Sequence, residues 1–248
     1  MGAIYIMWLR QIKRYWRSKA RMVGSLAQPV LFLVALGFGF GPIFQKAGGG
    51  NYMEFLAPGI IAMAILFTSM FNGIDLIWDR QFGFLKETMV APVPRYRIMI
   101  GRTLGGATIS MFQGIFVLII SLFIGFHITN LYYLPLALIF MFLIAFLFTA
   151  FGTAIATRLE DANAFPLIIN FLIMPLFFLS GALFSLGELS GVLKLVITLN
   201  PLSYGVDGLR GALGGVYQLG LFADLSVLLI IIFIVGIIST YLFNTMEA

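Results

Sequence analysis

Long apolar stretches make up most of the chain, and charged residues gather in the short segments between them. A helix that crosses a membrane needs about 20 mainly apolar residues, because each residue advances the helix by about 1.5 Å. Six stretches satisfy this requirement, so the pattern predicts six transmembrane helices. They are residues 22–44, 53–76, 98–126, 132–157, 164–186 and 222–243.

The composition supports a membrane location. Of the 248 residues, 61% are hydrophobic and 10% are charged, whereas a soluble chain is about half apolar and about one quarter charged. We therefore expect residues 1–248 to form a single all-α integral membrane domain. The chain has no cysteine and one histidine, which excludes a disulfide framework and a thiol nucleophile and leaves little material for a metal site.

The basic residues predict the orientation of the helices. Lys and Arg concentrate on the cytoplasmic side of membrane proteins. With the N-terminus inside, 12 of the 15 basic residues fall in inner segments. We therefore expect both termini on the cytoplasmic side of the cell membrane, and no nucleic-acid binding, because the charge lies at membrane edges. The inner residues are Arg10, Lys13, Arg14, Arg17, Lys19, Arg21, Arg80, Lys86, Arg95, Arg97, Arg102 and Arg158; the outer ones are Lys46, Lys194 and Arg210.

Residues 1–21 have a separate, amphipathic pattern. At about 100° per residue, most apolar side chains fall on one side of a helix and most basic side chains on the other. A basic amphipathic helix with tryptophans lies in the membrane interface, where its cations meet anionic lipid. We predict an interfacial helix with contacts from Trp8, Arg14, Trp16 and Arg17. It either anchors the topology or acts as a lateral gate or docking element.

Residues 77–97 form the most informative loop. Phe82, Leu85 and Met89 recur at helical spacing between charged residues, and Pro92 and Pro94 end the helix. The pattern predicts a short amphipathic helix at the cytoplasmic surface. Exposed apolar residues with charges of both signs suit docking to a partner protein. The alternative is an ordinary solvated connection.

Several motifs give the chain a family resemblance. In order along the sequence they are residues 57–60 (APGI), 79–88 (DRQFGFLKET), 91–93 (APV), 101–102 (GR) and 200–204 (NPLSY), the last followed by Asp207 and Arg210. Their order and spacing resemble the permease subunit of type-2 ABC transporters over essentially the whole chain. Lys86 is a mild departure at a position where that family varies.

The resemblance implies an ATP-driven transporter. Most members of that family export drugs, lipid-linked glycans or other amphipathic compounds. The resemblance implies that the 77–97 loop carries a coupling helix that fits a groove of an ABC ATPase subunit. It also implies a homodimer of permeases with two ATPase subunits. The residues expected to serve ATPase coupling are Arg80, Gly83, Leu85, Glu87 and Pro92.

The sequence itself contains no G-x-x-x-x-G-K-[ST] phosphate loop. The glycine runs at 48–50 and 214–215 have no following lysine. We therefore expect no enzymatic activity and no cofactor in this chain, and ATP and Mg²⁺ on the partner ATPase.

The predicted spans contain long stretches without charge, which are residues 22–45, 55–74, 103–157, 162–187 and 225–246. Ion-coupled carriers usually keep an ionisable residue at membrane depth. This pattern favours an external energy source and an amphipathic cargo, and leaves a gradient-driven secondary carrier as the alternative. A subunit of a membrane assembly without transport is a third possibility. A protease is disfavoured because His127, the one histidine, and Ser180 have no third orienting group.

Residues 187–220 mix apolar and polar positions. Residues 192–199 and 203–213 each read as a short helix, with Asn200 and Pro201 at the turn. Neither is long enough to cross, so we predict a re-entrant hairpin on the extracellular side. Asp207 and Arg210 lie three residues apart and are expected to pair. The resemblance places this hairpin at the outer end of the transport path; the alternative is a structural plug.

Small and polar residues within the spans predict close helix packing. Gly37 with Gly41 and Gly101 with Gly105 have the G-x-x-x-G spacing, which serves packing within one chain or a dimer seam. The polar residues are expected to form interhelical hydrogen bonds. They are Gln28, Asn72, Gln113 and Asn170.

Overall fold

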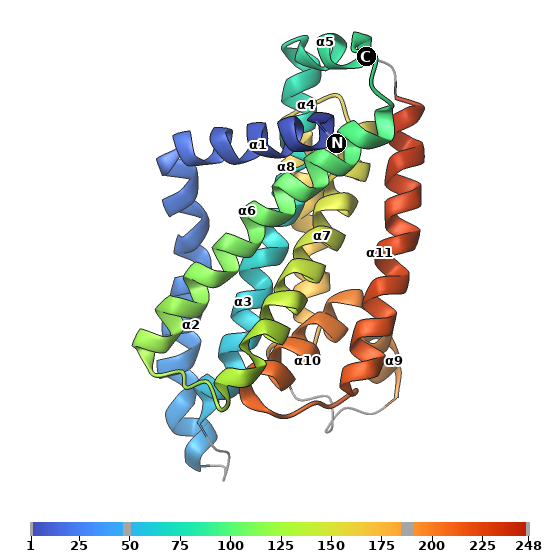
Figure 1. The fold of residues 1–248 in the computed structure, drawn as a ribbon. Helices are drawn as coiled ribbons and strands as arrows, with labels where there is room; N and C mark the ends of the chain where they lie inside the picture. Colours follow the sequence, from blue (N-terminus) through green and yellow to red (C-terminus); the bar gives the residue numbers. More distant parts are fainter. Residues whose placement is uncertain (1, 47–50, 185–190, 247–248) are drawn as a thin grey trace.

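The computed structural model describes residues 2–46, 51–184 and 191–246, and within these ranges the chain is helical and has no strand (Figure 1). The glycine run at 48–50 and the beginning of the predicted hairpin, residues 187–190, lie outside the described residues. The elements are α1 (Gly2–Arg17), α2 (Lys19–Lys46), α3 (Tyr52–Phe71), α4 (Ile74–Gln81), α5 (Phe84–Val90), α6 (Arg95–Ile124), η1 (Leu131–Tyr133), α7 (Leu134–Arg158), α8 (Ala164–Phe178), α9 (Val192–Leu199), α10 (Pro201–Gly214) and α11 (Leu221–Asn244).

Five helical stretches of the described chain are long and apolar enough to cross a membrane. They correspond to the first four predicted spans and to the last one. The predicted span at 164–186 forms α8, which has only 15 residues. At about 1.5 Å per residue, α8 is shorter than the hydrocarbon core of about 30 Å. The chain leaves the helix after Phe178, and Gly181 has a φ of 73°, which is a left-handed conformation that favours glycine.

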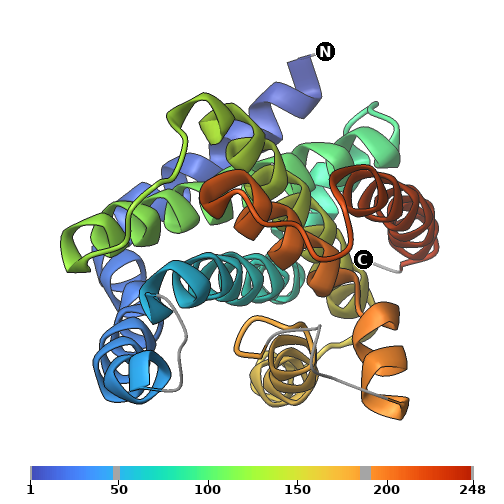
Figure 2. The ribbon, with the colours of Figure 1, turned by 90° about the horizontal axis from the view of Figure 1, so that it is seen from below.

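Helix α3 forms the centre of the bundle. It contacts α2, α6, α7, α8 and α10. In the most apolar 18-residue part of Tyr52–Gln81, 78% of the residues are buried. In the most apolar 18 residues of α2 and of α11, by contrast, only 17% and 11% of the residues are buried. These two helices lie on opposite sides of the bundle (Figure 2). Their exposed leucine, isoleucine and phenylalanine side chains form an apolar outer surface of the kind that faces lipid.

Helix α1 lies across one end of the bundle, at a steep angle to α2 (Figure 1). It packs closely on α6 because two glycines leave room for it. A Cβ atom on Gly101 would lie 2.8 Å from the carbonyl oxygen of Ile4, and one on Gly105 would lie 2.7 Å from the Cβ of Gln11. This glycine pair therefore serves packing within the chain. In the other pair, Gly37 packs against Met53 of α3 and Gly41 has open space around it.

The two ends of the bundle differ in character. Helices α1, α4 and α5 lie at the end that carries most arginines and lysines, which we call the basic end (Figure 1). The last turn of α11 reaches the same end, where Arg95 donates a hydrogen bond of 2.6 Å to the carbonyl oxygen of Asn244. Helices α9 and α10 lie at the opposite end, which we call the α10 end.

Candidate functional site

A buried carboxylate on α4 gathers three arginines at the basic end. The side chain of Asp79 is only 4% exposed. It accepts hydrogen bonds from Arg10 at 2.7 and 3.0 Å and from Arg14 at 3.3 Å, and it pairs with Arg102 of α6, which is equally buried. Removing charges from water is expensive unless they are paired and hydrogen-bonded. Asp79 therefore fixes α1 and α6 to α4.

Asp75, one turn before Asp79, extends this arrangement to α2. It accepts a hydrogen bond from Arg21 at 3.2 Å and lies 3.5 Å from a guanidinium nitrogen of Arg14. Arg21 also donates to the side-chain oxygen of Asn72, whose amide group in turn donates to the carbonyl oxygen of Gly106 on α6. We refer to these two carboxylates and their arginines as the arginine–aspartate cluster; its members are Asp75, Asp79, Arg10, Arg14, Arg21 and Arg102.

The cluster changes the interpretation of α1. The sequence pattern assigns the basic side of this helix to lipid headgroups, but Arg14 turns toward Asp75 and Asp79. Trp8 also binds within the protein, since its indole N–H donates to Thr108 of α6 at 3.1 Å. Trp16 and Arg17 are exposed and remain available to lipid. Only part of the predicted membrane contact of α1 therefore faces outward.

Tyr15 anchors the end of α1 in the bundle. Its hydroxyl donates a 2.8 Å hydrogen bond to the side-chain oxygen of Gln113 on α6. Burial raises the pKa of the Tyr15 phenol above its ordinary value, so the group remains a hydrogen-bond donor at neutral pH. Gln113 and Asn72 thus form the interhelical hydrogen bonds expected of polar residues in spans.

The predicted docking helix is α5, which follows α4 after a sharp turn. Gly83 makes the turn with a φ of 77°, which costs glycine little. Leu85 is 1% exposed and attaches α5 to the core, whereas Phe82 and Val90 are 76% and 84% exposed. Glu87 and Pro92 are exposed as well. Helix α5 therefore combines one buried contact with an outward surface of mixed apolar and charged residues.

Arg80, another of the predicted coupling residues, points back to the bundle. Its guanidinium donates to the carbonyl oxygens of Thr157 and Leu159 at 3.0 and 3.2 Å. These carbonyls lie at the C-terminal end of α7, where helical partners are missing. Arg80 therefore connects α4 to α7 and lies apart from the exposed surface of α5.

Asn200 organises the α10 end. Its side-chain oxygen accepts a hydrogen bond from the N–H of Leu202 and so caps α10, with Pro201 in the first turn. Its amide nitrogen donates to the carbonyl oxygens of Leu176 and Leu179 at 2.7 and 2.8 Å. The Asn200 side chain thus caps the start of α10 and donates hydrogen bonds to carbonyl groups at the end of α8.

Asp207 and Arg210 are both buried but do not pair with each other, contrary to the expectation from their spacing. The carboxylate of Asp207 accepts from the backbone N–H of Gln218 at 3.0 Å and of Leu219 at 2.7 Å. Arg210 donates to the carbonyl oxygen of Gly181 at 3.1 Å, and its guanidinium lies 3.9 Å from the ring centre of Phe55. Arg210 thus attaches α10 to α3 and to the segment after α8. Asp207 attaches α10 to the segment before α11.

Substitution of Asn200 tests its double role. We expect Asn200→Ala to lower the free energy of unfolding by about 2–4 kcal/mol, because a cap is worth about 1 kcal/mol and an unpaired buried carbonyl costs about 1–3 kcal/mol. Asn200→Asp is the matched variant, since it keeps the cap acceptor but cannot donate to Leu176 and Leu179. Thermal unfolding in detergent measures both. An Asn200→Asp protein as stable as the wild type would show that the two donated bonds contribute nothing.

One buried acid has no signal in the sequence pattern. Asp224 lies in the first turn of α11 and is 0% exposed, and neither of its carboxylate oxygens has a hydrogen-bond partner among the described residues. The apolar pattern of 222–243 hides it, because one acid at a helix start does not interrupt a span. The other buried charges of the described chain lie in the arginine–aspartate cluster and at Asp207 and Arg210, so they are confined to the two ends of the bundle.

Comparison with known proteins places these features in a family. Residues 2–213 match the family described as ABC-2 type transporter. The chain is 29% identical to the inner membrane transport permease YadH of Escherichia coli K12 over 93% of this chain and 90% of that protein. It is 31% identical to the transport permease ycf38 of Pyropia yezoensis over 81% of this chain and 70% of that protein. The corresponding ycf38 protein of Cyanophora paradoxa is 28% identical over 84% and 72% of the two chains. The chain therefore belongs to the ABC-2 type transporter family of membrane permeases.

Proposed function

We propose that this chain is the permease subunit of an ATP-driven exporter, and that a separate ABC ATPase docks on α5. The observation that carries the proposal is the exposed surface of α5 on a helix pair that is held firmly to the bundle. Asp79 and Arg80 connect α4 to α1, α6 and α7. A force on α5 would therefore reach several helices at once.

The orientation follows from the charges. We propose that the protein lies in the cell membrane with its basic end facing the cytoplasm, because Lys and Arg gather on the cytoplasmic side of membrane proteins. Both chain ends then lie in the cytoplasm. This requires six crossings, with α8 and the turn after it forming the fifth, and it makes α9 and α10 a re-entrant hairpin on the outer side.

The assembly is proposed from the family resemblance, and the cargo from the distribution of buried charge. We propose two copies of the chain with two ATPase subunits, with ATP and Mg²⁺ bound by the ATPases. Buried charges occur only near the ends of the bundle in the described chain, so the middle offers nothing to compensate a charged cargo. An amphipathic, drug-like or lipid-linked compound fits such a path.

A gradient-driven carrier is the second candidate, and Asp224 favours it. A buried acid whose oxygens accept no hydrogen bond from the described residues is the kind of group that a proton or cation would use. Its position at the first turn of α11 is close to one end, whereas coupling ions usually bind near the middle of the membrane. The ATP-driven function is therefore the better supported one.

The test is ATP hydrolysis by the chain co-expressed with the ATPase encoded beside it and reconstituted in liposomes. We expect hydrolysis above that of the ATPase alone, and a loss of at least about tenfold of this stimulation in Glu87→Ala, since charged contacts orient docking. Glu54→Ala is the matched control, because Glu54 is also exposed but starts α3 at the α10 end. If no ATPase associates and transport requires a pH gradient instead, the carrier is the correct function.

A further inference from the structure

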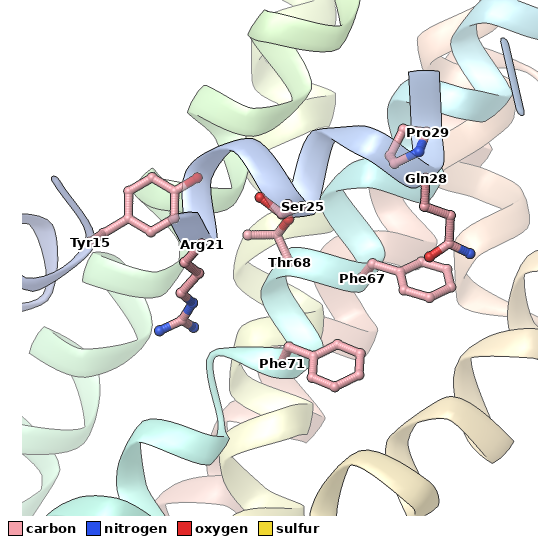
Figure 3. Close-up of a pocket in the computed structure, with 9 residues that line it drawn as sticks. Tyr15, Arg21, Ser25, Gln28, Pro29, Phe67, Thr68 and Phe71 are labelled. Carbon is pink, nitrogen blue, oxygen red and sulfur yellow. The ribbon is translucent and has the colours of Figure 1, made fainter. Parts of the chain in front are cut away.

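A pocket of about 370 Å³ lies between α2 and α3 near the basic end (Figure 3). Its wall is chemically divided. The polar side chains of Tyr15, Arg21, Ser25 and Thr68 line one part, and the rings of Phe67 and Phe71 line another, with the amide of Gln28 beside the Phe67 ring. The pocket thus has the two surfaces that an amphipathic ligand requires.

The hydroxyl group of Thr68 is a second feature of this pocket. The oxygen of Thr68 is buried and has no hydrogen-bond partner among the described residues. Nearly all buried polar atoms in proteins are hydrogen-bonded, so an exception indicates a missing partner. Because Thr68 lines the pocket, a ligand there would supply that partner.

The charge at the pocket is positive. Arg21 shares its carboxylate, Asp75, with Arg14. In the arginine–aspartate cluster as a whole, four arginines surround two carboxylates. The excess of positive charge would attract an anionic group to the side of the pocket where Arg21 lies.

The apolar part of the pocket borders the outer surface of α2. This helix is largely exposed along its length, and a Cβ atom added to Gly24, which lines the pocket, would meet nothing within 4 Å. A ligand can therefore enter sideways from the bilayer. A free inorganic anion would leave the phenylalanine rings uncovered, whereas a lipid chain would cover them.

We propose that this pocket binds one anionic phospholipid from the leaflet at the basic end, with its phosphate near Arg21 and the hydroxyl of Thr68 and an acyl chain along Phe67 and Phe71. The lipid would fill the gap between α2 and α3 beside the cluster that fixes α1. This proposal does not depend on the cargo or on the direction of transport.

Native mass spectrometry of the purified full-length chain tests the site, with dioleoyl phosphatidylglycerol, dioleoyl phosphatidylcholine and inorganic phosphate as probes. We expect one phosphatidylglycerol to bind at least about tenfold more tightly than phosphatidylcholine, and inorganic phosphate not to compete. A Cβ atom on Gly24 meets nothing within 4 Å, so Gly24→Phe adds a ring at the edge of the pocket without a backbone clash. We expect this variant to weaken phosphatidylglycerol binding at least about tenfold. Thr68→Val, which keeps the volume and removes the hydroxyl, is expected to weaken it about fivefold.

Lys13→Gln is the control, because Lys13 is an exposed cation of α1 outside the pocket. We expect this variant to bind phosphatidylglycerol as the wild type does. Equal affinity for the two lipids, or wild-type binding by a Gly24→Phe protein with an unchanged unfolding temperature, would overturn the proposal. Competition by inorganic phosphate would overturn it too, by showing a site for free anions.

Discussion

Asp79→Asn is expected to lower the free energy of unfolding by about 3–5 kcal/mol, which is the usual cost of breaking a buried ion pair by removing one partner. The carboxylate is the common acceptor for Arg10, Arg14 and Arg102. Without it, the guanidinium of Arg102 stays buried with no counter-charge, since no other ion pair is formed by this residue in the described chain. Thermal and denaturant unfolding in detergent micelles measures the loss.

Two carboxylates serve as controls for Asp79. Glu160→Gln changes an exposed acid, and we expect an effect within about 0.5 kcal/mol. Asp224→Asn changes a buried acid whose oxygens accept no hydrogen bond from the described residues, and we expect it to be neutral or stabilising. A loss for Asp79→Asn no larger than that for Glu160→Gln would show that the cluster does not hold the helices together.

The loss of Asp79 should also affect the function beyond stability. Helix α1 contacts α2, α6 and this cluster, and the guanidinium of Arg10 lies 3.6 Å from the ring centre of Phe84 on α5. Helix α5 continues from the helix that carries Asp79. In the proposed transporter, movement of α5 would pass through Asp79 to α1 and through Arg80 to α7. The cluster is thus the part of the structure that would make the docking helix and the interfacial helix move together.

The sequence predicts the positions of the long helices well, and it predicts the contacts between segments less well. Apolar length and flanking charge locate α2, α3, α6, α7 and α11, because both properties belong to single segments. The failure of α8 to reach a full span depends on the turn after Phe178, which Asn200 stabilises from more than 20 residues away. No local pattern contains such a contact.

The arginine–aspartate cluster does have a signal in the sequence. Arg10 and Arg14 are four residues apart on one helix, and Asp75 and Asp79 have the same spacing on another. Each pair lies on one helical face, so the two faces can match. A basic helix face is read most simply as lipid-facing, and only the crossing of α1 over α4 and α6 shows that it meets acids instead.

The double variant Phe82→Ala with Val90→Ala is expected to weaken binding of the ATPase subunit by at least about 30-fold, or about 2 kcal/mol. Exposed aromatic residues that become buried in a complex are typical hot spots. The ring of Phe82 is supported by Trp78, with ring centres 6.0 Å apart, and is therefore held outward. The measurement is the dissociation constant between the purified ATPase and this chain in nanodiscs.

Phe123→Ala is the matched control for this surface. Phe123 is 87% exposed and lies near the end of α6 that is remote from α5, so we expect the ATPase to bind this variant normally. Glu87→Ala separates binding from coupling, because one rim charge alters orientation more than affinity. If the double variant binds the ATPase as tightly as Phe123→Ala does, the exposed apolar residues of α5 and of the turn before it serve the membrane interface, and the ATPase must dock elsewhere at the basic end.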